Sequence, residues 1–184
     1  MGIAAQRGNV LRAKGWRQEG LLRLLENVLE NGEDPENLIV YGALGKAARD
    51  WPSYHAIVDS LLNLEEDESL IVQSGKPIAV LKTHRDAPVV IMANSNLVGQ
   101  WARPDYFYEL YDKNLIAWGG LTAGDWQYVG SQGVIQGTYE IFQSIARQAF
   151  GGSLQGRFIL SAGMGGMGGS QPLAGKLTGA AILV

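Results

Sequence analysis

The stretch GRFILSAGMGGMGGSQPLAG, residues 156–175, indicates how this chain folds. A short apolar run, RFILSA, leads into GMGGMG at residues 163–168, which satisfies the pattern G-x-G-x-x-G. A second apolar run, AAILV, follows within the length of one βαβ unit. A strand, a glycine turn, a helix and a second strand in this order predict the opening of a dinucleotide-binding domain.

The three glycines of the pattern have separate physical roles. Gly163 permits the tight turn, Gly165 lets backbone N–H groups approach a pyrophosphate, and Gly168 lets the helix pack closely on the strand. The amino terminus of the following helix adds partial positive charge for the phosphates. The acidic residue that holds the ribose in such sites would come after the second strand, beyond Val184. Tight turns in a loop-rich fold remain the alternative explanation for each glycine cluster.

The composition excludes several classes of function. The chain has 184 residues, a net charge of −3 and no cysteine, so no disulfide or thiolate site is expected. No basic excess points to nucleic acid or to an anionic membrane, and no stretch reaches the roughly 18 apolar residues that span a bilayer. We therefore expect a cytoplasmic protein without a metal site, and with neither nucleic acid nor membrane as a partner.

Alternating helical and strand patterns predict an α/β fold. Residues 17–31 have apolar positions at helical spacing, and residues 68–83 read as a β-hairpin. Residues 45–64 read as helical at both ends with a break near Pro52. The pattern places a boundary near residue 140. Residues 1–140 would then form one domain, and residues 141–184 the start of the dinucleotide-binding domain.

Several longer motifs resemble the amino-terminal third of the urocanase (urocanate hydratase) family. These are IVYGALGKAARDW, VQSGKP, MANSNLV, TAGDWQYVGSQGVIQGTYE and MGGMGGSQPLAG, and together they cover most of the chain. The resemblance implies a homodimer whose α/β core domain is interrupted by a Rossmann-type NAD domain. It also implies a hydro-lyase of histidine degradation that adds water to urocanate, giving imidazolonepropionate. NAD+, bound tightly with one per subunit, would act as an electrophile rather than as a redox carrier.

The resemblance also assigns roles to single residues. Those expected to contact NAD+ are Gly42, Ala43, Gly120, Gly163, Gly165, Gly166, Met167 and Gly168. Tyr41 and Thr122 are expected to line the pocket of the imidazole acrylate substrate. No catalytic residue is expected within this chain, because the family's arginine, cysteine and proton-transfer acid would lie beyond Val184. Residues 1–184 alone should therefore be inactive, and the histidines, His55 and His84, are expected to be structural.

Three positions depart from the family pattern. Ala43 replaces a glycine, Trp118 replaces a tyrosine, and Gly120 replaces a glutamine that contacts the cofactor. A site that loses a hydrogen-bonding group usually changes its preferred ligand. Urocanate is the first expectation, and a ring-modified urocanate, thiourocanate or its S-methyl form from ergothioneine-type breakdown, is the alternative. An NAD-dependent dehydrogenase and a non-catalytic interaction module are the hypotheses from other classes.

Overall fold

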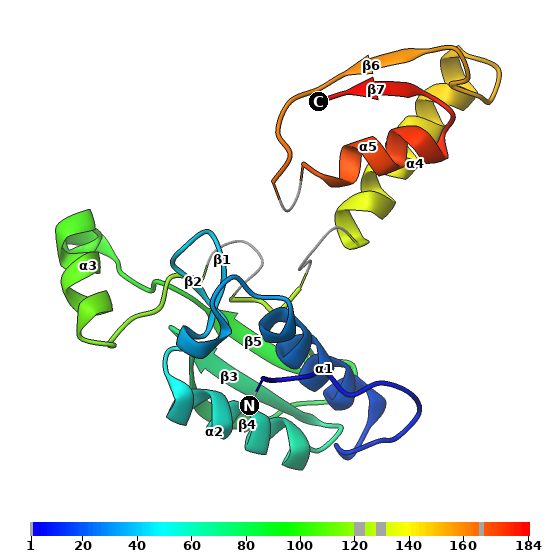
Figure 1. The fold of residues 1–184 in the computed structure, drawn as a ribbon. Helices are drawn as coiled ribbons and strands as arrows, with labels where there is room; N and C mark the ends of the chain where they lie inside the picture. Colours follow the sequence, from blue (N-terminus) through cyan, green and yellow to red (C-terminus); the bar gives the residue numbers. More distant parts are fainter. Residues whose placement is uncertain (1, 120–123, 128–131, 166–167) are drawn as a thin grey trace. The chain divides into compact units, whose positions relative to one another are not determined.

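The computed structural model describes residues 2–119, 124–127, 132–165 and 168–184. The chain divides into two compact units, residues 1–127 and residues 128–184, each with its own helices and strands. The mixture of helices and strands confirms the predicted α/β class (Figure 1). No helix in the described ranges is long and apolar enough to cross a membrane.

The first unit is built on a three-stranded sheet with the order β4-β3-β5. Strands β3 (Glu68–Gln73) and β4 (Lys76–Lys82) form the predicted hairpin, and β5 (Val90–Ala93) lies parallel to β3. Ser74 and Gly75 join the hairpin with φ values of 47° and 71°, the left-handed pair that suits a two-residue turn between twisted strands. Lys76 and Pro77 follow the turn directly as the first residues of β4.

Helix α2 (Trp51–Asn63) packs on this sheet, α1 (Trp16–Glu30) packs on α2, and the two helices build the core. Helix α1 matches the predicted helix within one residue at each end, and α2 packs against both α1 and β4 (Figure 1). Most of the buried side chains of these elements are apolar, as the helical spacing requires, although Gln18 and Glu19 of α1 are buried as well. The apolar ones include Leu22, Leu25, Leu29, Ile57, Leu61, Leu70 and Val72.

The expectation for residues 45–64 was partly wrong. Residues 45–50 are not helical: Gly45 and Lys46 form the short strand β2, which pairs with β1 (Ile39–Tyr41). Pro52 does not break a helix, because it lies in the first turn of α2, where a missing N–H costs nothing. The helix starts there because the Asp50 carboxylate accepts a hydrogen bond from the Ser53 N–H at 2.8 Å.

The amino-terminal segment lies against α1 and is held by three of its carboxylates. Glu30 accepts a hydrogen bond from the Ala5 N–H at 2.8 Å, and Glu26 accepts one from the Gln6 N–H at 3.2 Å. Glu19 accepts from the N–H groups of Arg12 and Ala13, at 2.9 and 3.0 Å. We call residues 2–15 the strap. The remaining elements of this unit are η1 (Pro35–Asn37), η2 (Gly99–Trp101) and α3 (Pro104–Asp112).

The second unit is a small parallel βαβ arrangement. Strand β6 (Phe158–Leu160) leads through the glycine turn to α5 (Ser170–Leu177), and the chain returns in β7 (Ala181–Leu183) parallel to β6. Helix α4 (Gln132–Ala149) packs against α5. Residue 140, the expected domain boundary, falls inside α4. The units instead divide between residues 127 and 128, ahead of α4. The whole of α4 belongs to the second unit, where it packs against α5.

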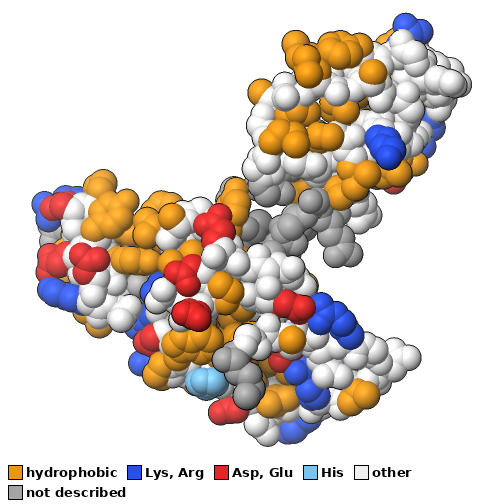
Figure 2. All heavy atoms as spheres, viewed as in Figure 1, with side chains coloured by type: hydrophobic (Ala, Val, Ile, Leu, Met, Phe, Trp, Pro, Cys, Tyr) orange, Lys and Arg blue, Asp and Glu red, His pale blue; other side chains and the backbone are white. Residues whose placement is uncertain are grey.

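One face of the β6–β7 pair is open. Phe158 and Leu160 are exposed on β6, as is Leu183 on β7, with exposed fractions of 64%, 72% and 58%. Figure 2 shows hydrophobic side chains gathered over these strands. Parallel strands are normally covered on both faces, so the uncovered face is that of an unfinished sheet.

Candidate functional site

The glycine turn lies where the sequence pattern predicts it, between the carboxyl end of β6 and the start of α5. Gly163 has a φ of 92°, in the left-handed region that glycine tolerates best. A Cβ at residue 168 would lie 2.8 Å from the carbonyl carbon of Gly163 and would collide with its oxygen. The turn therefore closes on itself, and only glycine fits at position 168.

The outer side of the same turn is open. A Cβ at Gly163 or at Gly165 would meet no atom of the described residues within 4 Å. The inner side is closed by hydrogen bonds from the Gly169 N–H to the Gly165 oxygen at 2.8 Å and from the Gln171 N–H to the Gly168 oxygen at 3.0 Å. Open glycine backbone at the carboxyl end of a parallel strand, followed by a helix amino terminus, fits the pyrophosphate of a dinucleotide.

Close packing of helix on strand depends on a different glycine from the one expected. A Cβ at Gly175, in the middle of α5, would lie 3.1–3.3 Å from three side-chain carbons of Ile182 on β7. The glycine motif predicts this role for Gly168, which instead contacts Gly163 within the turn. Gly175 lies outside the six-residue motif, so the motif alone could not identify it.

A second group of predicted residues lies at the tip of the β1–β2 hairpin. Tyr41 ends β1 with 36% of its surface exposed, and Gly42 and Ala43 follow it with φ values of 68° and 64°. Ala43 therefore adopts a left-handed conformation that favours the glycine it replaces. Its N–H donates to the Glu33 carboxylate at 3.1 Å, which helps to hold the tip in place.

The chain segment at residues 118 and 119 completes this part of the first unit. Gly45 pairs with Tyr41 on one side and with Trp118 on the other, and the Lys46 N–H donates to the Trp118 oxygen at 2.9 Å. Tyr41, Gly45 and Trp118 thus occupy one row across three neighbouring segments. Cross-strand partners point to the same face, so Tyr41 and Trp118 share a face with a glycine between them.

Asn94 is a residue of this region that the sequence analysis did not single out. It follows β5, and its side chain lies against Gly119 and Gly124. A Cβ at Gly119 would lie 2.6 Å from the Asn94 Cβ, and one at Gly124 would lie 2.7 Å from the Gly119 Cα. The signal was present in the motif MANSNLV, but the contact joins residues far apart in the sequence.

Trp126 anchors the same region of the first unit. Its side chain is fully buried, and its Nε1–H donates to the Ala47 oxygen at 2.8 Å. Nearby, burial raises the pKa of Asp125, and hydrogen bonds from the backbone, including the Gln127 N–H, partly oppose that rise. The buried indole holds residues 124–127 against the segment that follows β2.

Trp118 also forms one wall of a cavity of about 370 Å³. The ring of Phe107 on α3 meets Trp118 edge to face, with centroids 5.3 Å apart and planes at 82°. Eight residues line the cavity: Ser95, Leu97, Ala102, Arg103, Pro104, Phe107, Tyr108 and Trp118. Most of this lining is aromatic or aliphatic, which suits an apolar group.

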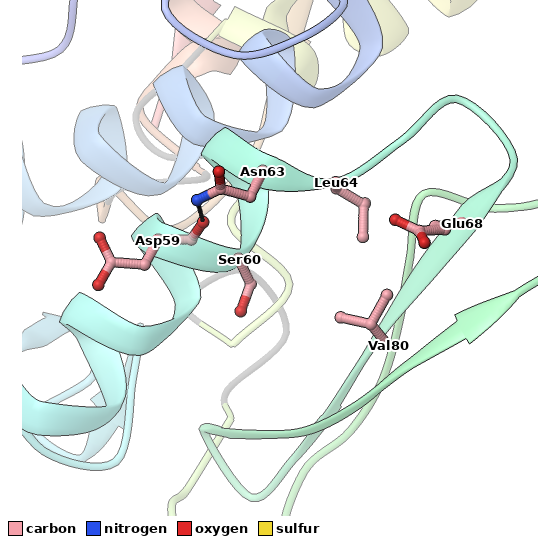
Figure 3. Close-up of a pocket in the computed structure, with 6 residues that line it drawn as sticks. All are labelled: Asp59, Ser60, Asn63, Leu64, Glu68 and Val80. Carbon is pink, nitrogen blue, oxygen red and sulfur yellow. Dashed lines mark hydrogen bonds between the residues drawn. The ribbon is translucent and has the colours of Figure 1, made fainter.

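Another hollow, of about 330 Å³, lies between the end of α2 and the β3–β4 hairpin (Figure 3). The hollow is bordered by Leu64, Glu68 and Val80. The Asp59 carboxylate points away from it, and the side-chain amide of Asn63 donates a hydrogen bond to the backbone oxygen of Asp59 at 2.8 Å. None of the residues predicted for the site lies in it.

The predicted residues therefore fall into two groups, one in each unit. Tyr41, Gly42 and Ala43 lie together beside Trp118, and Gly163, Gly165 and Gly168 form the glycine turn. Four further predicted residues, Gly120, Thr122, Gly166 and Met167, lie outside the described residues. The ring of His55 lies 5.9 Å from that of Trp51 on α2, at a distance typical of packed aromatic rings. Among the described residues no group of three or more histidine, aspartate or glutamate side chains is arranged to hold a metal ion.

Comparison with known proteins agrees with this division. Residues 3–127 match the urocanase N-terminal domain, and residues 130–184 match the urocanase Rossmann-like domain. A curated relative, the S-methyl thiourocanate hydratase of Variovorax sp. (strain JCM 16519 / RA8), is 57% identical over 182 residues. The match covers 99% of this chain but 33% of that protein, so the chain spans about a third of the relative's length.

Proposed function

This chain belongs to the urocanase family, and from that premise we propose that its protein is a hydratase acting on S-methyl thiourocanate. The 57% identity to an S-methyl thiourocanate hydratase, over nearly the whole chain, is the observation that carries the proposal. The substitutions at Trp118 and Gly120 support it, because both change the shape of the expected substrate pocket. Plain urocanate, the first expectation from the sequence, becomes the second candidate.

We propose that NAD+ is the cofactor. The glycine turn would hold its pyrophosphate through the backbone of Gly163, Gly165 and Gly168, and the tip of the β1–β2 hairpin would contribute Gly42 and Ala43. When bound, the cofactor supplies an electrophilic nicotinamide to the reaction. Backbone contacts suit a tightly held group, because they place hydrogen-bond donors without ordering flexible side chains.

The residues of this chain bind and orient the substrate. Tyr41 presents a partly exposed ring and a hydroxyl group at the end of β1, and Trp118 presents a second aromatic ring on the same face. A planar imidazole acrylate can stack on such rings while its carboxylate accepts hydrogen bonds. The proton-transfer groups are assigned to the part of the protein beyond Val184, and a homodimer is part of the proposal.

The test compares two substrates in the full-length protein. We expect a higher kcat/KM for S-methyl thiourocanate than for urocanate, with no NADH formed in step with product. A preference for urocanate would assign the protein to ordinary histidine degradation. Stoichiometric formation of NADH would reject a hydratase and restore the dehydrogenase hypothesis.

A further inference from the structure

The cavity beside Trp118 lies next to the proposed substrate pocket and is not explained by the cofactor site. Its walls come from α3, from residues 95–97 and from Trp118. The Arg103 guanidinium at this cavity lies 3.5 Å from the Asp105 carboxylate, so its charge is partly balanced within the first unit. The remaining lining is mainly carbon, which favours an uncharged group.

The row formed by Tyr41, Gly45 and Trp118 connects this cavity to the predicted substrate residue. Neighbouring strands lie about 4.8 Å apart, so Tyr41 and Trp118 are separated by about 10 Å across the glycine. A substrate ring held at Tyr41 therefore has Trp118 within reach of a ring substituent.

We propose that this cavity receives the methylthio group of the substrate and is the feature that selects a ring-substituted urocanate. The inference rests on the proposed function. A methylthio group has the chemistry of a methionine side-chain end, and its sulfur makes favourable contacts with aromatic rings such as those of Trp118, Phe107 and Tyr108. Unsubstituted urocanate has only a ring hydrogen at that position, which leaves the cavity unfilled.

The experiment fills the cavity from a lining residue other than Trp118. Ala102 lines the cavity and is exposed, so Ala102→Leu adds volume there without disturbing the core. In the full-length protein we expect kcat/KM for S-methyl thiourocanate to fall by about tenfold or more, the usual effect of a mismatched apolar group, with urocanate changed by no more than about twofold. Trp118→Tyr, which restores the family residue, should shift the ratio of the two kcat/KM values in the same direction.

Val80→Leu is the matched control. It adds one methylene group to the other hollow (Figure 3), whereas Ala102→Leu adds three carbons to the cavity, and it should leave both kcat/KM values as in the unmodified protein. The inference fails if Ala102→Leu leaves the substrate ratio unchanged, whether both values persist or both fall together. It also fails if that variant changes the oligomeric state, because a second copy would then cover the cavity.

The substrate preference of the unmodified protein shows whether a negative result rejects only this inference or the proposed function as well. If it prefers S-methyl thiourocanate but Ala102→Leu keeps that preference, the substituent is recognised elsewhere and only the inference is overturned. If the unmodified protein hydrates urocanate alone, or neither compound, the proposed function is rejected and the inference falls with it.

Discussion

At the scale of single residues, Gly168 and Gly165 occupy the same turn under different constraints. A Cβ at residue 168 would collide with the carbonyl group of Gly163, whereas within the described part of the chain a Cβ at residue 165 would meet no atom within 4 Å. A side chain at position 168 therefore disturbs the turn itself. A side chain at position 165 disturbs only what approaches the turn from outside.

This difference gives a paired prediction for the cofactor. Gly165→Val and Gly168→Val should both abolish retention of NAD+ through purification, since each blocks the approach of the pyrophosphate to the backbone. Loss of bound NAD+ lowers the thermal unfolding midpoint in both variants, and Gly168→Val should lower it further because its side chain also collides with Gly163. The measurement is NAD+ released per subunit after denaturation, together with the midpoint for each variant.

Gly137→Val is the control for this pair. Gly137 lies on the exposed side of α4, where a Cβ meets no atom within 4 Å, so the variant should keep its full NAD+ content. Full occupancy of the cofactor in Gly165→Val would show that the phosphates do not approach the turn at this residue.

At the scale of elements, the strap and α1 are joined through a buried carboxylate. The side chain of Glu19 is fully buried, and it lies 3.0 Å from the Arg12 guanidinium and 2.7 Å from that of Arg23. Burial by itself raises the pKa of Glu19. The hydrogen bonds from Arg23, from the N–H groups of Ala13 and Arg12 and from the Arg12 side chain outweigh it and lower the pKa to about 2.

The lowered pKa predicts how stability depends on pH. Because the carboxyl group has its ordinary pKa of 4.5 in the unfolded chain, its contribution is complete above that value and is lost as pH falls toward 2. The shift corresponds to about 3 kcal/mol in the free energy of unfolding. Glu19→Gln should therefore destabilise the protein at pH 7 by about 3–5 kcal/mol, since Arg23 loses its carboxylate partner and Arg12 keeps only Glu26.

Urea unfolding of the full-length protein between pH 7 and pH 3 measures this effect. The difference between Glu19→Gln and the unmodified protein should shrink as the pH falls. Glu66→Gln is the matched control, because the Glu66 side chain is 65% exposed and lies 3.8 Å from its partner, Arg85. An exposed pair contributes about 0–1 kcal/mol. Equal effects of the two variants at pH 7 would contradict the role given to Glu19.

At the scale of the whole molecule, the open face of β6 and β7 shows what residues 1–184 lack. Two parallel strands with exposed Phe158, Leu160 and Leu183 need further strands and helices to bury their apolar surface. The curated relative is about three times as long as its match to this chain, so it contains enough additional sequence to supply such elements.

We predict that residues 1–184, produced alone, will show no hydratase activity and will associate through this face. Light scattering should detect the association, and Leu160→Lys should reduce it by placing a charge on the exposed strand. Gln136→Lys, on the exposed side of α4, adds the same charge elsewhere and should not reduce it. Hydration of either urocanate by residues 1–184 alone would show that the later groups are not needed.

Much of the fold could be predicted because its signals are local. The spacing of leucines sets the limits of α1, and the apolar runs on both sides of Ser74 and Gly75 set the β3–β4 hairpin. The glycine pattern located the turn after β6 for the same reason, since each of its steric requirements involves residues within about ten positions. The first half of residues 45–64 was predicted wrongly, because pairing of β2 with β1 and with Trp118 overrode its local helical pattern.

The sequence by itself therefore determined the α/β class, the glycine turn and, through its motifs, the urocanase family. Only the tertiary structure decided which separate segments meet: Asn94 against Gly119, Trp126 against Ala47, and Phe107 against Trp118 beside a cavity. The physical reason is that close approach and enclosed volume arise when segments distant in the chain pack together. A local sequence pattern predicts the turn or helix that contains it, but it does not predict which side chains of other segments will pack against that turn or helix.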